Sequence, residues 1–368
     1  MSIKESAKIK LAVLYGGLSA EHEISLQSAA AVISNLDQTK FHIIPVGIDK
    51  QGHCFINEIS QISTQQLARA LPLRTKTSTT LTTIAQLNGQ ICDVVFPVLH
   101  GSMGEDGTIQ GLLEVLDLAY VGADVLGSAL GMDKEVAKRL VSAAHIPVVP
   151  FLTLDSGLWL KQKAAYVQDI EEKISYPLFV KPVHAGSSLG LSKVKKSAEL
   201  IGAIERAFTY STRVLVEKAF NVREIEIAVL ENLSWGESAL LSAAGEIIPS
   251  HEFYSYDAKY LDAKGAELII PAVLSTGQLR QLKSLAARIF TCLNCAGMAR
   301  IDFFIEKQSQ KIYFNEINTI PGFTQISMYP KLWEASGISF QALLTHLIEL
   351  AMARHRRLAR AKIFTLNK

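Results

Sequence analysis

Cysteine is scarce, with 4 in 368 residues, and this excludes the class of small secreted domains held together by disulfides. Cys292 and Cys295 form one isolated C-x-x-C, and no further pair of ligands at zinc spacing lies near them in the sequence. We interpret the two as packing residues at a helix end. Sparse thiols fit a reducing compartment, so we expect a cytoplasmic protein.

Long hydrophobic runs are also lacking. The least charged long stretch, residues 141–160, contains Pro147, Pro150 and Asp155, which is unlike a membrane-spanning helix. An excess of one charge is lacking as well, because 37 Lys and Arg against 35 Asp and Glu give a formal net charge of +2. This balance predicts neither a nucleic-acid partner nor a membrane partner. The basic segment 353–362 continues a helical pattern, and we expect a solvated terminal helix rather than a binding arm.

Apolar sequence is abundant, at 49% of residues, and it forms strand-like runs that alternate with helical ones. Segments 10–17, 41–49 and 92–100 predict buried strands. Segment 18–36 shows helical periodicity, with Ser19 as the expected N-cap. This alternation predicts an α/β fold class with an open parallel sheet, in which ligands gather beyond the carboxyl ends of the strands.

The length exceeds what a single core usually supports and predicts two or three domains. Changes of pattern along the chain favour three. An amino-terminal α/β domain would cover 1–128. A central domain would cover 129–220, opened by one helix over 122–140, and a carboxyl-terminal domain would cover 221–368. Neither an internal repeat nor a low-complexity segment is visible in the sequence.

Two apolar segments, MARIDFFIE and KIYFNEIN, flank a short polar connection and predict a β-hairpin. An even register would place Asp302 opposite Glu316 and Arg300 opposite Asn318. Because side chains alternate along a strand, all four would then share one face. The other face would hold the apolar residues Ile301, Phe303, Tyr313 and Ile317.

Two carboxylates and an amide are the oxygen ligands that Mg²⁺ prefers, completed by phosphate and water oxygens. Arg300 beside them could neutralise a developing negative charge. Gly322 follows a proline, and a glycine there lets its backbone N–H approach a ligand closely. A solvated sheet face with ordinary ion pairs is the alternative, and the amide and the Pro-Gly turn favour the metal site.

A second region of the sequence is a candidate anion-binding site. Lys181 stands at the end of an apolar strand, before a loop that holds Gly186, Ser187 and Gly190. Small residues with accessible N–H groups cradle phosphates, and a lysine adds a point charge. A flexible Gly/Ser turn is the alternative, since the Walker spacing occurs nowhere in the chain.

Weaker signals come from isolated residues. Glu217 follows an apolar strand and Glu224 comes seven residues later, which suits an adenine edge and ribose hydroxyls but also suits surface charges. His100 ends a strand and could serve a site or be a hydrogen-bonded structural histidine. Lys134, in the first turn of a helix, would by itself be a surface residue. The long polar and aromatic stretch 250–272 predicts a lid.

Together these segments resemble the D-alanine:D-alanine ligase family of the ATP-grasp superfamily. The resemblance lies in several blocks in the family's order, over nearly the whole chain: YGGLSAEHEISL, PVLHGSMGEDGTIQGLLE, GMDKEVAK, FVKPVHAGSSLGLSKV, EFYSYDAKYLD, ARIDFF and NEINTIPGFTQISMYPKLWEASGISF. The combination is highly specific, whereas each block alone is not. The loop that holds Gly186, Ser187 and Gly190, here called the serine loop, departs from some relatives. Its VHAG segment is uncharged apart from His184, where those relatives carry Arg-Glu.

The resemblance implies a three-domain ATP-grasp fold and joining of two D-alanines through an acyl phosphate. It implies nucleotide contacts from Lys134, Lys181, Glu217, Lys218, Ala219, Phe220 and Glu224. It implies that two Mg²⁺, or Mn²⁺, bind Asp302, Glu316 and Asn318. It implies catalytic roles for Glu21, Ser187, Tyr260, Arg300 and the Gly322 N–H, and substrate contacts from His100, Lys259 and Ser327. It also implies a homodimer.

Three alternatives stay open at this point. The nearest is a ligase that uses D-lactate or D-serine as second substrate, and Tyr260 in the lid favours the dipeptide type. A silent ATP-grasp binding protein is the second, which the intact Arg300, Asp302, Glu316 and Asn318 disfavour. A nicotinamide-dependent oxidoreductase is the third, and the absence of G-x-G-x-x-G after the first strand disfavours it.

Overall fold

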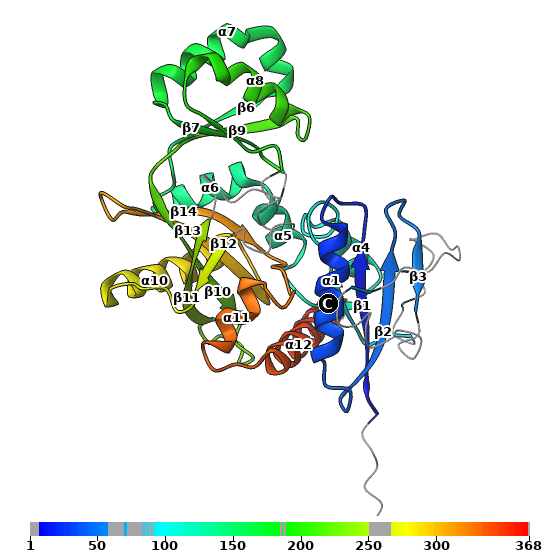
Figure 1. Ribbon diagram of the computed structural model, residues 1–368. Coiled ribbons are helices and arrows are strands. Elements are labelled where there is room, and N and C mark those ends of the chain that lie inside the picture. The colour runs from blue at the N-terminus through cyan, green and yellow to red at the C-terminus, as the bar shows by residue number, and fades with distance from the viewer. Residues whose placement is uncertain are drawn as a thin grey trace, which may run out of the picture.

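The computed structural model describes residues 7–57, 70–71, 84, 87, 91–184, 186, 189–249 and 266–366. Its elements form three β-sheets with helices packed around them (Figure 1). Three of the sequence-predicted site residues lie outside the described residues: Ser187, Lys259 and Tyr260. The predicted lid, apart from its end in β12, lies outside them as well.

The first sheet contains the predicted buried strands. In spatial order its five strands are β3 (Cys54–Ile56), β2 (Phe41–Ile48), β1 (Ile9–Gly16), β4 (Val94–Val98) and β5 (Ala119–Tyr120). All neighbours are parallel except β2 and β3. Every residue of β4 is buried, as expected where helices cover a parallel sheet. The prediction of a parallel α/β sheet is confirmed.

Helix α1 (His22–Asn35) follows β1, and the prediction of Ser19 as its cap is wrong. Glu21 occupies the N-cap position without a side-chain cap bond, because a turn separates Ser19 from the helix. The Ser19 hydroxyl instead donates to the carbonyl of His100 at 2.6 Å. This bond joins the loop after β1 to the loop after β4, so Glu21 and His100 meet at one edge of the sheet.

The second sheet is antiparallel. Its strands, in spatial order, are β6 (Phe151–Asp155), β9 (Arg213–Lys218), β7 (Leu178–Pro182) and β8 (Ser192–Val194). Helices α7 (Ser156–Lys173) and α8 (Ser197–Phe208) pack on it through Trp159, Ile170 and Ile204. The helices cover one face, and the other face looks toward the third sheet (Figure 1).

The third sheet is also antiparallel. Its strands, in spatial order, are β12 (Ala266–Ile269), β11 (Leu240–Pro249), β10 (Val222–Leu230), β13 (Met298–Glu306) and β14 (Ile312–Asn318). Helix α10 (Thr276–Cys292) buries Leu282, Leu285 and Ile289 against the face that carries Ile225 and Ile301. The opposite face of β10, β13 and β14 is therefore left for polar side chains.

The predicted hairpin forms with the predicted register at its functional end. Arg300 pairs with Asn318 and Asp302 with Glu316. The register then shifts, so that Phe303 pairs with Phe314. The shift has a tertiary cause: the Phe314 N–H donates to the carbonyl of Pro147 at 2.9 Å, and Val148 bridges to Phe314 from outside the hairpin.

The bulge corrects one expectation. Beyond Asn315 the alternation of β14 is reversed, so Phe314 joins the apolar core and Tyr313 does not. Tyr313 lies on the polar face, where its ring stacks on Phe220 with a centroid distance of 5.4 Å. Ile301, Phe303 and Ile317 do take the apolar face as predicted.

Two helices, not the single one expected, link the first sheet to the second. Asp133 has extended φ and ψ angles and separates α5 (Val125–Met132) from α6 (Lys134–Ala143). Its carboxylate accepts the N–H of Val136 at 2.9 Å and so caps α6. This break places Lys134 in the first turn of α6, which packs against β14 (Figure 1).

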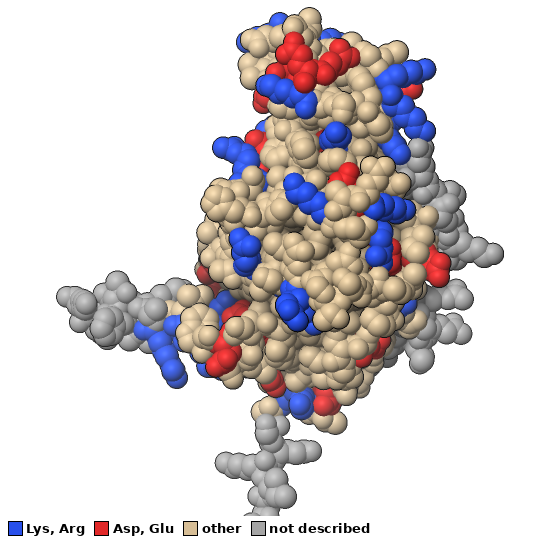
Figure 2. Space-filling model, turned by 90° about the vertical axis from the view of Figure 1, so that its left-hand side faces the viewer, with Lys and Arg blue, Asp and Glu red and all other residues tan. Residues whose placement is uncertain are grey.

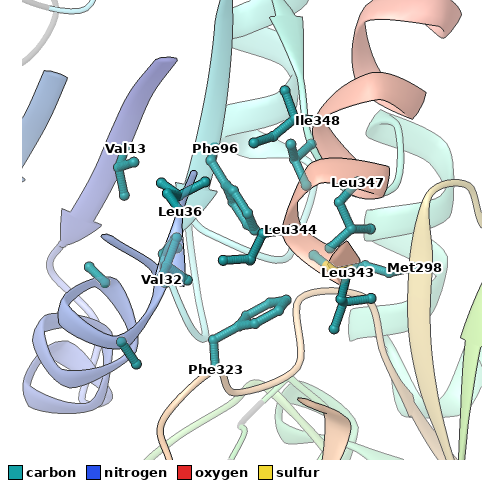
Figure 3. Close-up of a cluster of buried hydrophobic side chains, with 14 of the residues drawn as sticks. Val13, Val32, Leu36, Phe96, Met298, Phe323, Leu343, Leu344, Leu347 and Ile348 are labelled. Carbon is teal, nitrogen blue, oxygen red and sulfur yellow. The ribbon is translucent and has the colours of Figure 1, made fainter. Parts of the chain in front are cut away.

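The carboxyl-terminal helices α11 (Met328–Glu334) and α12 (Phe340–Leu366) share a core with the first sheet. Leu344 and Ile348 of α12 point toward Phe96 of β4, and Phe323 lies beneath them (Figure 3). Phe96 and Phe323 make an edge-to-face contact at 5.6 Å. The turn that carries Gly322 is thus fixed against the amino-terminal sheet by aromatic packing.

The expectation that the basic segment of α12 is solvated is wrong for Arg354. Its guanidinium donates to the carbonyls of Gly122 at 2.6 Å and Tyr120 at 2.8 Å, and it stacks on the Tyr120 ring. Arg354 therefore anchors α12 to the strand that ends the first sheet.

Surface charges are mixed, as the net balance suggested. Figure 2 shows Lys and Arg interspersed with Asp and Glu over the face in view. Among the described residues, the helices include none that is long and apolar enough to span a membrane.

Candidate active site

A cavity of about 590 Å³ lies between the second and third sheets. This volume is in the range of cofactor sites. Residues from β7, β9 and the β9–β10 turn line one side, and residues from β10, β13 and β14 line the other. Seven predicted nucleotide residues and two predicted metal ligands line it: Lys134, Lys181, Glu217, Lys218, Ala219, Phe220, Glu224, Asp302 and Glu316.

Arg300 is the centre of the polar face of the hairpin. Its Nε and Nη2 each lie 2.8 Å from an oxygen of Asp302, in a bidentate pair. The Asn318 amide donates to the same carboxylate at 3.1 Å. The side chains predicted to share this face are therefore in contact.

Glu226 completes this cluster and was missed from the sequence. It lies opposite Asp302 on the neighbouring strand β10, with a carboxylate oxygen 2.8 Å from the Nε of Arg300. Asp302 and Glu226 outweigh the desolvation of the guanidinium and hold the pKa of Arg300 well above its usual value. Arg300 is thus a permanent cation in this cleft.

The donor set fits a divalent cation whose coordination shell is completed by the phosphate oxygens of a bound molecule. Asp302 and Glu316 face each other on paired strands, and Asn318 is two residues along the same face. Among the described residues, no cluster of three or more His, Cys, Asp or Glu could hold a metal alone. Two carboxylates and an amide suit Mg²⁺ or Mn²⁺ when phosphate and water oxygens complete the shell.

Lys134 reaches this cluster from α6. Its ammonium lies 3.6 Å from an oxygen of Glu316, and its side chain is only 12% exposed. The interpretation of Lys134 as a surface residue is therefore wrong. Because α6 begins directly after the break at Asp133, the side chain of Lys134 in its first turn reaches Glu316 on β14.

Glu217 pairs with two lysines, Lys181 and Lys138. One carboxylate oxygen lies 2.7 Å from the ammonium of Lys181, and the other lies 2.9 Å from that of Lys138. Burial raises the pKa of Glu217, but the two ammonium groups together hold it below its usual value. Lys138 was not singled out from the sequence, although its spacing of four from Lys134 places both on one helix face.

The turn between β9 and β10 provides a flat apolar edge. The backbone N–H groups of Lys218 and Ala219 donate to the carbonyls of Pro150 and Pro177 at 3.1 and 3.0 Å. The Phe220 ring stacks on Tyr313, and the Lys218 ammonium lies 5.4 Å from the Phe220 ring centre. This turn lines the cavity and offers a surface along which a planar base can lie.

A smaller cavity of about 160 Å³ adjoins the hairpin on the side of the first sheet. It is lined by eight predicted residues: Glu21, His100, Lys134, Arg300, Glu316, Asn318, Gly322 and Ser327. The Glu21 carboxylate fills the space beside Gly101 and Gly186, where an added methyl group would lie 2.6 and 2.7 Å from its oxygen. Glu21 therefore lies against Gly186 of the serine loop.

His100 joins the first sheet to the turn after β14. Its Nε2 is 2.9 Å from the hydroxyl of Ser28, and its Nδ1 is 3.2 Å from the carbonyl of Ile320. Despite burial, Glu105 and the hydrogen bonds raise the pKa of His100. His100 is both a hydrogen-bonded structural residue and part of the cavity wall.

Ser28→Ala tests this junction. The Ser28 hydroxyl also accepts the N–H of Phe323 at 3.3 Å, so its removal leaves two buried groups without their partner. We expect the free energy of unfolding to fall by about 1–3 kcal/mol and the substrate KM to rise because the Ile320–Phe323 turn loosens. Urea unfolding and steady-state kinetics measure both. Ser34→Ala, at an exposed hydroxyl that donates to the Ala30 carbonyl within α1, is the control.

Gly322 and Ser327 form one turn. The Ser327 hydroxyl accepts the N–H of Thr324 at 3.0 Å and lies 2.7 Å from the hydroxyl of Thr324. A methyl group on Gly322 would lie 2.7 Å from the Ser327 oxygen. Glycine at position 322 therefore allows the close approach of the Ser327 hydroxyl within this turn.

His184, the departure noted in the serine loop, contacts α6 rather than solvent alone. Its Nε2 lies 3.0 Å from the carboxylate of Asp133, which also pairs with Arg213. These hydrogen bonds lower the pKa of Asp133 to about 2 despite its burial. The base of the serine loop is thus tied to the residue that caps the helix of Lys134.

Comparison with known proteins decides the family. The chain matches the family model described as D-ala D-ala ligase C-terminus over residues 140–349, and the one described as D-ala D-ala ligase N-terminus over residues 10–123. The chain belongs to the D-alanine–D-alanine ligase family. The predicted resemblance and the predicted ATP-grasp fold are therefore confirmed.

Curated and solved members of this ligase family match over nearly their full length. D-alanine–D-alanine ligase A of Bradyrhizobium diazoefficiens is 47% identical over 365 residues, covering 95% of this chain and 96% of the relative. The D-alanine–D-alanine ligase structure from Coxiella burnetii has a TM-score of 0.79 at 35% identity, covering 99% and 100% of the two chains. The VanG D-Ala:D-Ser ligase of Enterococcus faecalis has a TM-score of 0.78 at 37% identity, covering 94% and 100%.

Proposed function

We propose that this protein joins two D-alanines at the expense of ATP, forming D-alanyl-D-alanine, ADP and phosphate for peptidoglycan synthesis. Family membership supports the reaction. The single observation that carries it is the contact of Arg300, Asp302 and Asn318 opposite Glu316, between a nucleotide-sized cavity and a small second cavity. A silent binding protein would have no need of this arrangement.

The nucleotide is proposed to occupy the larger cavity. The adenine lies along the turn formed by Lys218, Ala219 and Phe220, and Glu224 receives the ribose hydroxyls. Because the N–H groups of Lys218 and Ala219 are engaged within the protein, the Phe220 N–H is assigned to the adenine edge. Lys134 from α6 and Lys181 from β7 both line the cavity, and their ammonium groups hold the phosphates.

Two Mg²⁺ are proposed between the phosphates and Asp302, Glu316 and Asn318, with Mn²⁺ as a substitute. Bound there, the metals offset the repulsion between a substrate carboxylate and the triphosphate. A metal there would compete with Arg300 for Asp302. Glu226, whose oxygen lies 2.8 Å from the same Nε of Arg300 that Asp302 contacts, would then keep a carboxylate beside the guanidinium.

The first D-alanine is proposed to lie in the smaller cavity. Glu21 receives its ammonium group and His100 lies beside it. A carboxylate oxygen of this substrate attacks the γ-phosphorus of ATP, the bond to ADP breaks, and an acyl phosphate forms. This step supplies the leaving group that a carboxylate lacks.

The neutral amine of the second D-alanine then attacks the acyl carbon. Negative charge develops on the carbonyl oxygen, and Arg300 and the Gly322 N–H are placed to stabilise it. The tetrahedral intermediate expels phosphate and the amine loses a proton, giving the dipeptide. Ser327 and Lys259 are proposed to hold the phosphate or the second carboxylate.

The second substrate distinguishes the remaining candidates. Similarity to a D-Ala:D-Ser ligase is as high as that to a D-alanine ligase structure, so D-serine is the second candidate. The proposed homodimer rests on family resemblance, and the proposed cytoplasmic location rests on the scarcity of cysteine.

Measurement of ADP release with D-alanine, D-serine, D-lactate and L-alanine tests the function, followed by mass spectrometry of the product. We expect D-alanine alone to support release of one ADP per D-alanyl-D-alanine formed. Equal turnover with L-alanine, or no product with D-alanine, would contradict the proposal. A mixed dipeptide that dominates with D-alanine and D-serine together would establish the second candidate.

Glu21, Ser187 and Tyr260 resemble the family's hydrogen-bonded trio, and we propose that they link the amino-terminal domain, the serine loop and the lid. Tyr260→Phe tests this trio. An acyl phosphate hydrolyses readily unless water is excluded. We therefore expect more ADP per dipeptide than the wild-type ratio of one. Tyr210→Phe, at a ring that is 55% exposed, is the control, and unchanged coupling in Tyr260→Phe would argue against the trio.

A further inference from the structure

Lys138 is the most deeply buried charged side chain near the cleft, with 0% exposure. Its ammonium lies 2.9 Å from one oxygen of Glu217, whose side chain is 4% exposed. It also lies 5.8 Å from the ring centre of Phe314. A lysine in such surroundings loses most of its hydration, and a lysine in an amphipathic helix normally points to water.

Three elements meet at this lysine. Glu217 comes from β9, Lys181 approaches the other oxygen of Glu217 from β7, and Glu316 adds a more distant negative charge from β14. On its own helix, Lys134 is one turn earlier and points to Glu316. Glu217 is therefore clamped between two ammonium groups, and only that of Lys181 faces the nucleotide cavity.

The charge balance of this triad gives Lys138 a function. Glu217 with Lys181 alone would be neutral, and the carboxylate would cancel the attraction of Lys181 for a phosphate. With Lys138 the triad keeps one net positive charge beside the cavity. Lys138 also fixes the carboxylate, because a carboxylate held at both oxygens cannot rotate away from Lys181.

We infer that Lys138 is a positioning residue for nucleotide binding, which acts through Glu217 to orient Lys181 and to leave its charge available to the phosphates. The inference rests on the proposed function, because it presumes a nucleotide in the larger cavity. Lys138 itself touches neither nucleotide nor reacting atoms. Its loss is therefore expected to change affinity for nucleotide more than the rate of the chemical steps.

A pH readout separates this role from a merely structural ion pair. Burial lowers the pKa of Lys138 to about 8, against the opposing effect of Glu217. Lys138 is thus charged below this pH and neutral above it. Wild-type affinity for ADP should fall as pH rises through about 8, as the triad changes from net positive to neutral.

The test compares Lys138→Met, Lys138→Arg and the wild type. Calorimetry measures the Kd of ADP with Mg²⁺ from about pH 7 to about pH 9.5, where the phosphates stay ionised. At the lower pH we expect Lys138→Met to bind ADP roughly tenfold to a hundredfold more weakly, with ATP KM raised and kcat changed less. Its Kd should also lose the inflection near pH 8. Lys163→Met, at an exposed ion pair with Glu205, should match the wild type.

Lys138→Arg keeps the charge at all these pH values. It should bind ADP close to the wild-type Kd at the lower pH, without the inflection. If Lys138→Met fails to fold, this variant decides alone, since an unchanged inflection near pH 8 in Lys138→Arg would overturn the inference. A folded Lys138→Met with wild-type Kd would overturn it too. Absence of ADP binding in the wild type would instead overturn the proposed function.

Discussion

Replacement of Arg300 by methionine is expected to lower kcat for dipeptide formation by on the order of 10²–10³. Arg300 is placed to meet the charge of the tetrahedral intermediate, which is absent from bound substrates. Its loss should therefore affect kcat and kcat/KM alike. Steady-state ADP release, with dipeptide measured in parallel, gives both constants.

The same substitution should destabilise the protein. Arg300 pairs with both Asp302 and Glu226 at 2.8 Å, and its removal leaves two largely buried carboxylates facing each other. Loss of one member of such a group costs about 3–5 kcal/mol. Arg300→Lys is the matched control, since it keeps the charge but not the bidentate geometry. A kcat within a few-fold of wild type in folded Arg300→Met would contradict the oxyanion role.

Replacement of Glu316 by glutamine is the second large effect. The substitution keeps the size of the side chain and removes one of the two carboxylates of the proposed metal site. We expect kcat to fall by on the order of 10²–10³, because metal-dependent charge stabilisation supplies several kcal/mol. Higher Mg²⁺ concentration should recover part of the activity. Calorimetry should also show weaker binding of ADP in the presence of Mg²⁺.

Glu334→Gln is the control for Glu316→Gln, since it removes a carboxylate at the end of α11, away from the cleft. Glu316 also contacts Lys134, so its replacement can change phosphate affinity through Lys134 as well as through the metal. The Kd of ADP is therefore also measured without Mg²⁺. If Glu316→Gln keeps wild-type activity at every Mg²⁺ concentration, the proposed metal site is wrong.

The hairpin shows how far local sequence rules reach. The spacing of polar and apolar residues was enough to place Asp302 opposite Glu316, because alternation and register are properties of two adjacent segments. The bulge at Asn315 could not be predicted, because residues 147 and 148 cause it from another part of the chain. Tyr313 was misplaced for this reason.

Residues contributed by non-adjacent strands were also missed. Glu226 belongs to the site only because β10 neighbours β13, and strand order is a tertiary property. Lys138 resembles any helical lysine until the sheet that buries it is known. Arg354 likewise looks solvated until α12 packs beside β5. Sequence motifs located the cleft, whereas its charge balance required the fold.

We propose that a divalent metal bound by Asp302 and Glu316 holds the nucleotide phosphates in the cleft. Calorimetric titration of the wild type with ADP, with Mg²⁺ and then with a chelator in its place, tests it most directly. We expect clear binding with Mg²⁺, a Kd weakened by tenfold or more on chelation, and loss of this difference in Asp302→Asn. Equal affinity with and without Mg²⁺ in the wild type would contradict the account.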